Sequence, residues 1–209
     1  MYKKSMKKNK ISYRKSGVSI KAAENFVKFI SSVSNRSKKS GKFKNIGNFA
    51  SITGIPKSFN NPKIVTSTDG VGTKIEIANI LKKFNTIGID LVAMCINDIL
   101  VHGGKPIFFL DYLAVEKLNK RVALDLLSGI TKGCKESNCS ILGGETAEMP
   151  GLYKKNDFDL AGFAVGIVEK KKLITGKSIK EGDLVFGLKS TGFHSNGFSL
   201  IRYILKKKK

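Results

Sequence analysis

Apolar and polar residues follow one another along this chain in patterns that predict both helices and strands. Between residues 22 and 33 the apolar side chains recur every three or four positions, which is typical of an amphipathic helix. Two denser apolar stretches predict helices at Gly88–His102 and Lys120–Ser137, and a final helix begins within Ser195–Leu205. Short runs of β-branched and apolar residues predict strands, at Lys63–Ser67, Ile107–Val115, Ser140–Leu142, Leu160–Glu169 and Leu184–Leu188.

The chain divides into three parts by composition. Residues 1–12 are charged and poor in apolar residues, which predicts a disordered basic tail, and Ser34–Lys44 is a basic, serine-rich loop. Residues 13–170 can form one domain, and residues 171–209 begin a second, incomplete one after a turn signal at Ile179–Asp183. The last helix would lack a sheet to pack on. We therefore predict an exposed apolar patch, formed by Phe198, Leu200, Ile201, Tyr203, Ile204 and Leu205.

The segment at residues 66–74 carries the clearest chemical signal. A strand that includes Ile64 and Val65 runs into Thr68-Asp69-Gly70-Val71-Gly72-Thr73-Lys74. Glycines allow the backbone to approach an anion, Lys74 can neutralise it, and the Asp69 carboxylate can hold Mg²⁺. The spacing is not that of a Walker loop, and a strand-to-helix turn alone would also use these glycines.

Two further groups of acidic residues lie downstream. In the predicted helix at residues 88–102, Asp90, Asn97 and Asp98 interrupt an apolar surface. Asp90 and Asn97 are two turns apart and can share one helix face. Such aspartates need donors or a cation when they are buried, although an N-cap or a buried hydrogen bond would also explain them. A second apolar strand ends in Gly143-Gly144-Glu145-Thr146, so the three groups together predict a pocket for Mg²⁺ and a triphosphate.

A glycine-bounded polar loop, Gly192-Phe193-His194-Ser195-Asn196-Gly197, precedes the last predicted helix. His194 is one of only two histidines in the chain. A single loop histidine is often structural. Its small polar neighbours also suit contact with a phosphate or a substrate.

These motifs, in this order, resemble the aminoimidazole ribonucleotide synthetase (phosphoribosylformylglycinamidine cyclo-ligase) family from about Tyr13 to Leu205. The most specific blocks follow the segment at 68–74 and are Thr86–Met94, Asn97-Asp98, Phe109–Tyr112, Glu145–Gly151 and Gly192–Gly197. The resemblance implies an α/β (α+β) fold with a mixed sheet covered by helices on one face. It also implies that the domain at 13–170 binds ATP and pairs with a second copy to form a dimer barrel.

The resemblance implies a reaction as well. ATP and Mg²⁺ would activate the formyl oxygen of formylglycinamidine ribonucleotide, and ring closure would give aminoimidazole ribonucleotide, ADP and phosphate. The implied metal ligands are Asp69, Asp98 and Glu145, and the implied catalytic residues are His194 and Asp111. Ser195 and Asn196 would bind substrate. The residues implied for ATP binding are Thr68, Asp69, Gly70, Gly72, Thr73, Lys74, Asp90, Asn97, Gly144 and Thr146.

The chain departs from the family pattern in four places. Ser19 stands where the family usually has an aspartate, and Ile46–Ile52 has fewer glycines than the corresponding family segment. Lys105 replaces an acidic residue within Gly103-Gly104-Lys105-Pro106. Family members are also much longer than 209 residues. These departures leave open a catalytically silent nucleotide-binding or dimerisation module, and a related enzyme such as selenophosphate synthetase or thiamine monophosphate kinase.

Composition restricts the location and the partners. No stretch reaches the length of a membrane span, and the start of the chain lacks the apolar core of a secretory signal, so we expect a cytoplasmic protein. The three cysteines form no Cys-x-x-Cys pair and are expected to be reduced, although Cys134 and Cys139 could approach each other around a helix end. The net charge of +22 would suit nucleic acid. We do not expect nucleic-acid binding, because the lysines are scattered and no recognition motif is present.

Overall fold

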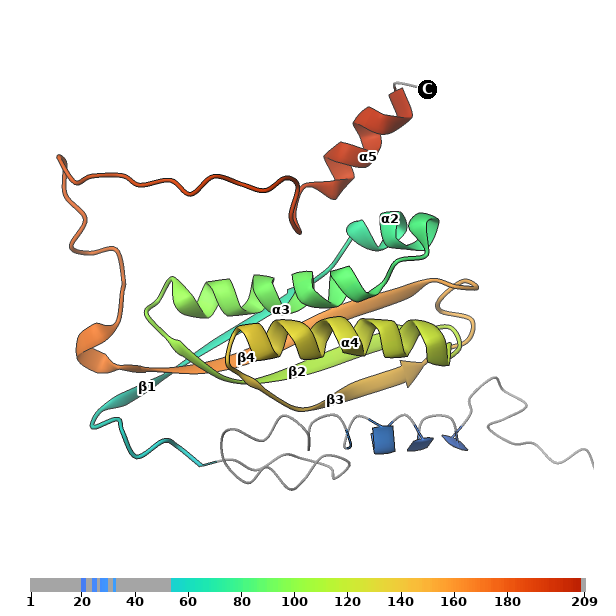
Figure 1. The fold of residues 1–209 in the computed structure, drawn as a ribbon, viewed down its shortest axis with the longest axis horizontal. Helices are drawn as coiled ribbons and strands as arrows, with labels where there is room; N and C mark the ends of the chain where they lie inside the picture. The colour runs from blue at the N-terminus through green and yellow to red at the C-terminus, as the bar shows by residue number, and fades with distance from the viewer. Residues whose placement is uncertain (1–19, 22–23, 26, 30–31, 33–53, 208–209) are drawn as a thin grey trace, which may run out of the picture.

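The computed structural model describes residues 54–207, together with residues 20–21, 24–25, 27–29 and 32. Within 54–207 the chain alternates strands and helices before a long segment without regular structure (Figure 1). In chain order the elements are β1 (Pro62–Gly70), α2 (Lys74–Leu81), α3 (Asn85–Leu100), β2 (Lys105–Val115), α4 (Lys120–Glu136), β3 (Ser140–Glu148), β4 (Phe158–Glu169), the 3₁₀ helix η1 (Lys170–Lys172) and α5 (Phe198–Lys207).

The four strands form one mixed sheet in the order β1-β4-β2-β3. β4 runs antiparallel to both β1 and β2, whereas β2 and β3 are parallel and are joined through α4. The pairing places Asp69 of β1 and Asp111 of β2 on either side of Gly162 in β4. The expected mixed sheet is therefore confirmed.

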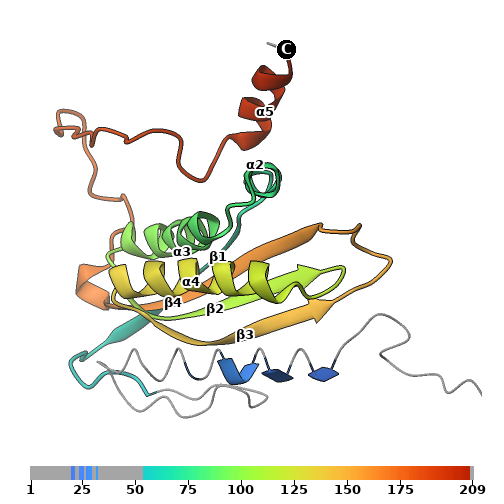
Figure 2. The same ribbon diagram turned by 45° about the vertical axis from the view of Figure 1, so that its right-hand side comes forward.

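Helices α3 and α4 cover one face of this sheet, as Figures 1 and 2 show from two directions. Their apolar sides are buried against the strands, and the largest fully buried side chains include Leu91, Phe109 and Leu126. The two helices approach closely because glycines face each other at their crossing. A side chain at Gly129 would overlap the backbone of Asn85, so the absence of a Cβ there permits the contact.

The opposite face of the sheet is exposed in part. Side chains alternate along each strand, and a Cβ at Gly162 would overlap the Phe109 ring and lie 3.1 Å from Leu91 of α3, so Gly162 points toward the helices. Its neighbour Phe163 points away from them and is exposed, as is Ile64 of β1. An apolar surface thus remains on the side of the sheet that α3 and α4 do not cover.

Most predicted elements are confirmed, with four corrections. β1 continues past Ser67 to Gly70, so Thr68, Asp69 and Gly70 lie in a strand. β3 continues to Glu148, so Gly144, Glu145 and Thr146 lie in a strand and not in the loop expected after Leu142. Helix α2 was not predicted as a separate element. The segment Leu184–Leu188 is not a strand, because no other strand pairs with it among the described residues and its backbone groups face solvent.

The N-terminal predictions are tested only in part. Residues 24–25, 27–29 and 32 of the predicted first helix are helical. The basic tail at 1–12 and the loop at 34–44 lie outside the described residues. Within the part of the chain that is described, no helix is long and apolar enough to cross a membrane.

Candidate functional site

The connection between β1 and α2 forms the centre of the candidate site. The strand ends at Gly70, Gly72 adopts a left-handed backbone with a φ of 62°, and the helix begins at Lys74. A non-glycine residue is disfavoured at that φ, so Gly72 is needed for the turn itself. Thr73 precedes the helix without capping it, and its Oγ1 instead lies 3.0 Å from Oγ of Ser199.

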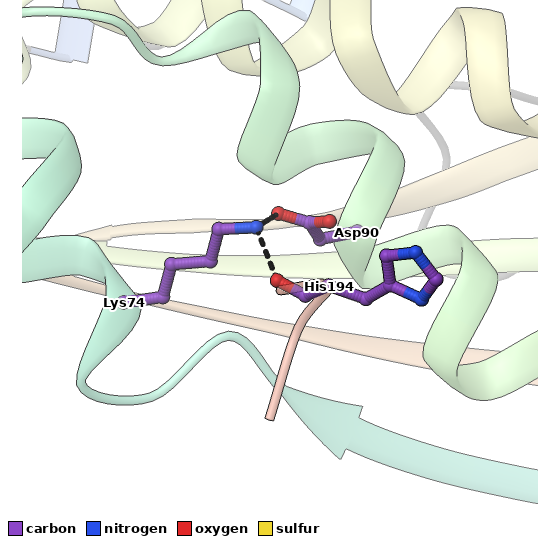
Figure 3. A network of polar contacts seen from close by, with 3 residues as sticks. All are labelled: Lys74, Asp90 and His194. Carbon is purple, nitrogen blue, oxygen red and sulfur yellow. Dashed lines mark hydrogen bonds and ion pairs between the residues drawn. The ribbon is translucent and has the colours of Figure 1, made fainter. Parts of the chain in front are cut away.

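Lys74 joins three segments that are far apart in the sequence (Figure 3). Its Nζ forms an ion pair with the Asp90 carboxylate of α3 and donates a hydrogen bond of 2.6 Å to the main-chain oxygen of His194. The same Nζ lies 5.0 Å from the ring centroid of Phe198, a cation–π distance. Both charged side chains are 17% exposed, so the pair is shielded from most of the solvent. The structure therefore brings the predicted residues Lys74, Asp90 and His194 together.

The imidazole of His194 makes a separate contact. Its Nε2 lies 3.0 Å from Oγ1 of Thr191, within the same loop. Figure 3 shows the ring turned away from the ion pair, while the main-chain oxygen points toward it. His194 thus reaches the site through its backbone. Ser195 and Asn196 follow it in the loop that leads to α5.

Asp69 and Asp98 lie on the side of the sheet that faces the helices. Oγ of Ser67 donates a 2.9 Å hydrogen bond to Oδ2 of Asp98, and Oδ1 of Asp69 accepts a 2.7 Å bond from the Gly70 amide. Both carboxylates act on the Cys95 thiol. Its pKa is raised to about 12, mostly by burial and in part by the charges of Asp69 and Asp98. Asp69 and Asp98 are therefore neighbours, as expected for two ligands of one cation.

Glu145 lies on the other side of the sheet. In the pairing of β2 with β3, Tyr112 lies beside Glu145 and Asp111 lies beside Gly144. Because paired residues share a face and consecutive residues alternate, Glu145 points away from Asp111 and Asp69. Within the described chain, no three His, Cys, Asp or Glu side chains are grouped so that they could hold a metal ion by themselves. The three-residue metal set stays a prediction, of which the structure brings together Asp69 and Asp98.

Among the described residues, Asp111 is the one buried residue with an ionisable carboxyl. The pKa of its carboxyl is raised from 3.8 to about 7, mostly by burial and in part by the charge of Glu145. Its Oδ1 has no hydrogen-bond partner among the described residues. A side chain at Gly144 would overlap this oxygen, so Gly144 makes room for the carboxyl. The contact between Asp111 and Gly144 is a packing contact between neighbouring strands. The predicted role of Asp111 in catalysis and that of Gly144 in ATP binding stay predictions.

The remaining predicted residues lie around this centre. Thr68 donates its hydroxyl to the Gly162 carbonyl at 3.0 Å, and Asn97 is exposed on α3. Thr146 is half-buried in β3. The sequence did not indicate Ser67, Phe198 or Ser199. Ser67 could have been found from strand alternation, because residues 67 and 69 share a face.

Beyond η1 the chain is exposed. Leu184, Val185, Phe186 and Leu188 have little cover, with Val185 95% exposed. None of the α5 residues is buried, and Phe198 and Ile201 are half-buried against the rest of the molecule, so the predicted apolar patch is largely confirmed. Polar contacts to the start of α2 hold this helix, including Arg202 to Glu76 at 3.6 Å.

A family model decides the assignment of the domain. Residues 54–168 match the model of the AIR synthase related protein, N-terminal domain. The chain belongs to that family. The match extends from before β1 to residue 168 in β4, and it includes Lys74, Asp90, Asp69 and Asp98.

Two bacterial relatives of this chain are named phosphoribosylformylglycinamidine cyclo-ligase. The chain is 51% identical over 196 residues to a phosphoribosylformylglycinamidine cyclo-ligase of Clostridium perfringens, and 51% identical over 198 residues to one of Thermoanaerobacter pseudethanolicus. These matches cover 94% and 95% of this chain. The chain spans 59% of the length of each relative.

Solved structures share the fold. A thiamine-monophosphate kinase from Stenotrophomonas maltophilia superposes with a TM-score of 0.56 at 16% identity, covering 71% of this chain and 43% of the kinase. The hydrogenase maturation protein HypE, in complex with ATP, superposes with a TM-score of 0.57 at 16% identity, covering 80% of this chain and 46% of HypE. The expected α/β (α+β) fold is thereby confirmed for the sheet and its helices.

Proposed function

We propose that this chain contributes the ATP-binding domain of an enzyme that converts formylglycinamidine ribonucleotide to aminoimidazole ribonucleotide, ADP and phosphate. The observation that carries the proposal is the contact of Lys74 with both Asp90 and the His194 loop at the end of β1. The names of the bacterial relatives support the choice of reaction. The domain is proposed to cover residues 13–170, and residues 171–209 are proposed to begin the next domain.

The residues at the β1–α2 connection suit the phosphates of ATP. Gly70 and Gly72 leave the backbone accessible, Thr73 offers a hydroxyl, and Lys74 offers a positive charge at the start of a helix. Asp90 holds the Lys74 side chain in one orientation, since the ion pair is mostly shielded. This preorganisation reduces the cost of ordering a flexible lysine when the anion binds.

The neighbouring carboxylates suit Mg²⁺. This ion takes hard oxygen ligands and is usually bound through one or two carboxylates together with phosphates and water. Asp69 and Asp98 supply such a pair, and Ser67 fixes the orientation of Asp98. When bound, the ion would neutralise the charge on the transferred phosphoryl group. Glu145, Asn97, Gly144 and Thr146 remain proposed ligands of the assembled enzyme, as do Ser195 and Asn196 on the substrate side.

A second copy of the chain is the proposed partner of the sheet. The face that α3 and α4 leave uncovered carries exposed Ile64 and Phe163. Pairing two such faces would bury apolar surface in the dimer barrel that the family resemblance implies. The proposed location is the cytoplasm.

Calorimetric titration of Mg-ATP, with and without formylglycinamidine ribonucleotide, tests the proposal. We expect Mg²⁺-dependent heat of binding, and ADP release would identify a chain that turns over by itself. Binding without turnover would favour the alternative of a catalytically incomplete fragment. Absence of binding would overturn the ATP-binding assignment, and salt-sensitive binding of DNA without ATP binding would favour the nucleic-acid alternative.

Asp69→Asn gives the sharper form of this test. Hydrogen bonds and contacts to charged groups contribute about 1.5–3 kcal/mol, so Mg-ATP should bind about tenfold more weakly or worse. Asp183→Asn is a matched control, because it removes the same charge in an exposed turn, where the side-chain oxygen accepts from the Lys180 amide. Equal affinities for the two variants would show that Asp69 does not bind the nucleotide complex.

A further inference from the structure

The end of α4 brings two cysteines together. Asn138 adopts a left-handed backbone with a φ of 52°, its amide donates to the Lys135 carbonyl at 3.2 Å, and the Cys139 amide donates to the Cys134 carbonyl at 2.9 Å. These two hydrogen bonds around a left-handed residue form a Schellman motif. In this motif the residue after the turn folds back onto the last helical turn. The side chain of Cys139 therefore meets that of Cys134.

The Schellman turn places the two thiols beside each other. Their interaction raises the pKa of Cys134, which burial raises further, and lowers the pKa of Cys139. Cys134 is 2% exposed, whereas Cys139 is half-buried. Cys139 is thus both the more accessible and the more acidic member of the pair.

The third cysteine has a different environment. Cys95 is fully buried in α3, and burial raises the pKa of its thiol to about 12. A disulfide in solution cannot reach a fully buried thiol for the first attack, and the raised pKa also disfavours the reactive thiolate. Cys95 therefore serves as an internal control within the same chain.

We propose that Cys134 and Cys139 form a dithiol site that low-molecular-weight disulfides such as oxidised glutathione convert to an intramolecular disulfide. The Cys139 thiolate attacks one sulfur of the disulfide and releases one glutathione thiol, leaving glutathione attached to Cys139. The Cys134 thiol then gives its proton to the released glutathione thiolate and attacks Sγ of Cys139 beside it, which releases the second glutathione thiol. One small disulfide is reduced to two thiols, and two protein thiols are oxidised to one disulfide.

Metal binding is a less suitable use of the pair. A structural zinc site takes four protein ligands. Over the described residues no third His, Cys, Asp or Glu side chain completes such a group with the two thiols. A disulfide between the two cysteines would link the last turn of α4 to the residue before β3. β3 begins at Ser140 and carries Gly144 and Glu145.

Treatment of the native chain with oxidised glutathione, followed by acid quench and intact mass measurement, tests the site. We expect a product lighter by two hydrogens, in which alkylation after unfolding modifies Cys95 alone. Peptide mapping should show a Cys134–Cys139 link. A stable glutathione adduct on Cys139, or full retention of all three thiols, would overturn the proposal.

Variants separate the two chemical steps. Cys134→Ala should stop at the glutathione adduct on Cys139, and Cys139→Ala should remain unmodified. Asn138→Gly keeps the left-handed turn, so this variant should form the Cys134–Cys139 disulfide as the unaltered chain does. Asn138→Val disfavours this φ, so that variant should accumulate the glutathione adduct on Cys139. Equal yields of the Cys134–Cys139 disulfide in both Asn138 variants would overturn the role of the Schellman motif.

A denatured control covers the case in which a variant fails to fold. In concentrated urea the unaltered chain should lose the preference for Cys139, since the Schellman turn that places the two thiols beside each other is absent. The same preference in urea as in buffer would show that local sequence, and not the folded helix end, determines the reactivity.

Discussion

Residues 54–172 and residues 173–207 differ in what covers their apolar side chains. In the first region two helices pack on a sheet, and Leu91 is 0% exposed. In the second, Leu188 is 101% exposed although it belongs to an equally apolar run. An apolar sequence forms a strand or a core only where neighbouring elements accept its hydrogen bonds and side chains. The second region contacts the first through Lys74, Thr73 and Glu76, and through hydrogen bonds between Ile174 and His102.

The largest expected effect comes from a pair of identical substitutions in the two regions. Leu91→Ala removes a fully buried side chain and should destabilise the chain by about 2–5 kcal/mol. Leu188→Ala should change the free energy of unfolding by less than about 0.5 kcal/mol. Denaturant titration of both variants measures the difference. A large loss in Leu188→Ala would show that the second region is packed in solution.

Asp111→Asn should remove a pH dependence that belongs to the first region. The folded-state pKa of Asp111 is raised from 3.8 to about 7, so the folded chain binds this proton more tightly than the unfolded chain does. Protonation of Asp111 therefore contributes fully to the free energy of unfolding below pH 3.8, and this contribution is lost as the pH rises through about 7. Above pH 7 the variant should therefore be more stable than the unaltered chain by on the order of 4 kcal/mol.

Denaturant unfolding of both proteins between pH 5 and pH 8.5 checks this sign. The difference between them should be smallest at the acid end. Parallel stability curves across the range would mean that the Asp111 carboxyl is solvated or paired.

Asp90→Asn tests the contact between the two regions. Loss of the shielded ion pair with Lys74 should cost about 1–3 kcal/mol and weaken the attachment of the His194 loop. Lys132→Met breaks an exposed pair with Glu136 and should cost less than about 0.5 kcal/mol. Limited proteolysis between residues 173 and 197 measures the attachment. Equal cleavage of the two variants would contradict the bridging role of Asp90.

Thr191→Ala should have the smallest effect. Its hydroxyl contacts only the exposed His194 ring, at 3.0 Å, while the His194 main-chain oxygen keeps its bond to Lys74. Nucleotide affinity and stability should both stay within experimental error of the unaltered chain. A clear loss of affinity would show that the orientation of the imidazole matters for binding.

The candidate site was partly predictable for physical reasons. The segment at 66–74 combines glycines, hydroxyls, a carboxylate and a lysine in one short stretch, so its chemistry could be identified without a fold. The separation of Glu145 from Asp69 could not be predicted, because it depends on the extension of β3 past Gly144 and on the strand register. The partner of Lys74 likewise required the packing of α3 beside α2.

The sequence by itself determined the local elements, the family and the identity of the candidate residues, because periodicity and short motifs are local properties. Tertiary structure decided which carboxylates face the helices, which cysteines touch, and which apolar runs are buried. These outcomes depend on contacts between residues that are distant in the chain, such as Lys74 with His194 and Asp111 with Gly144. The folded chain fixes such contacts by packing and hydrogen bonding between separate elements.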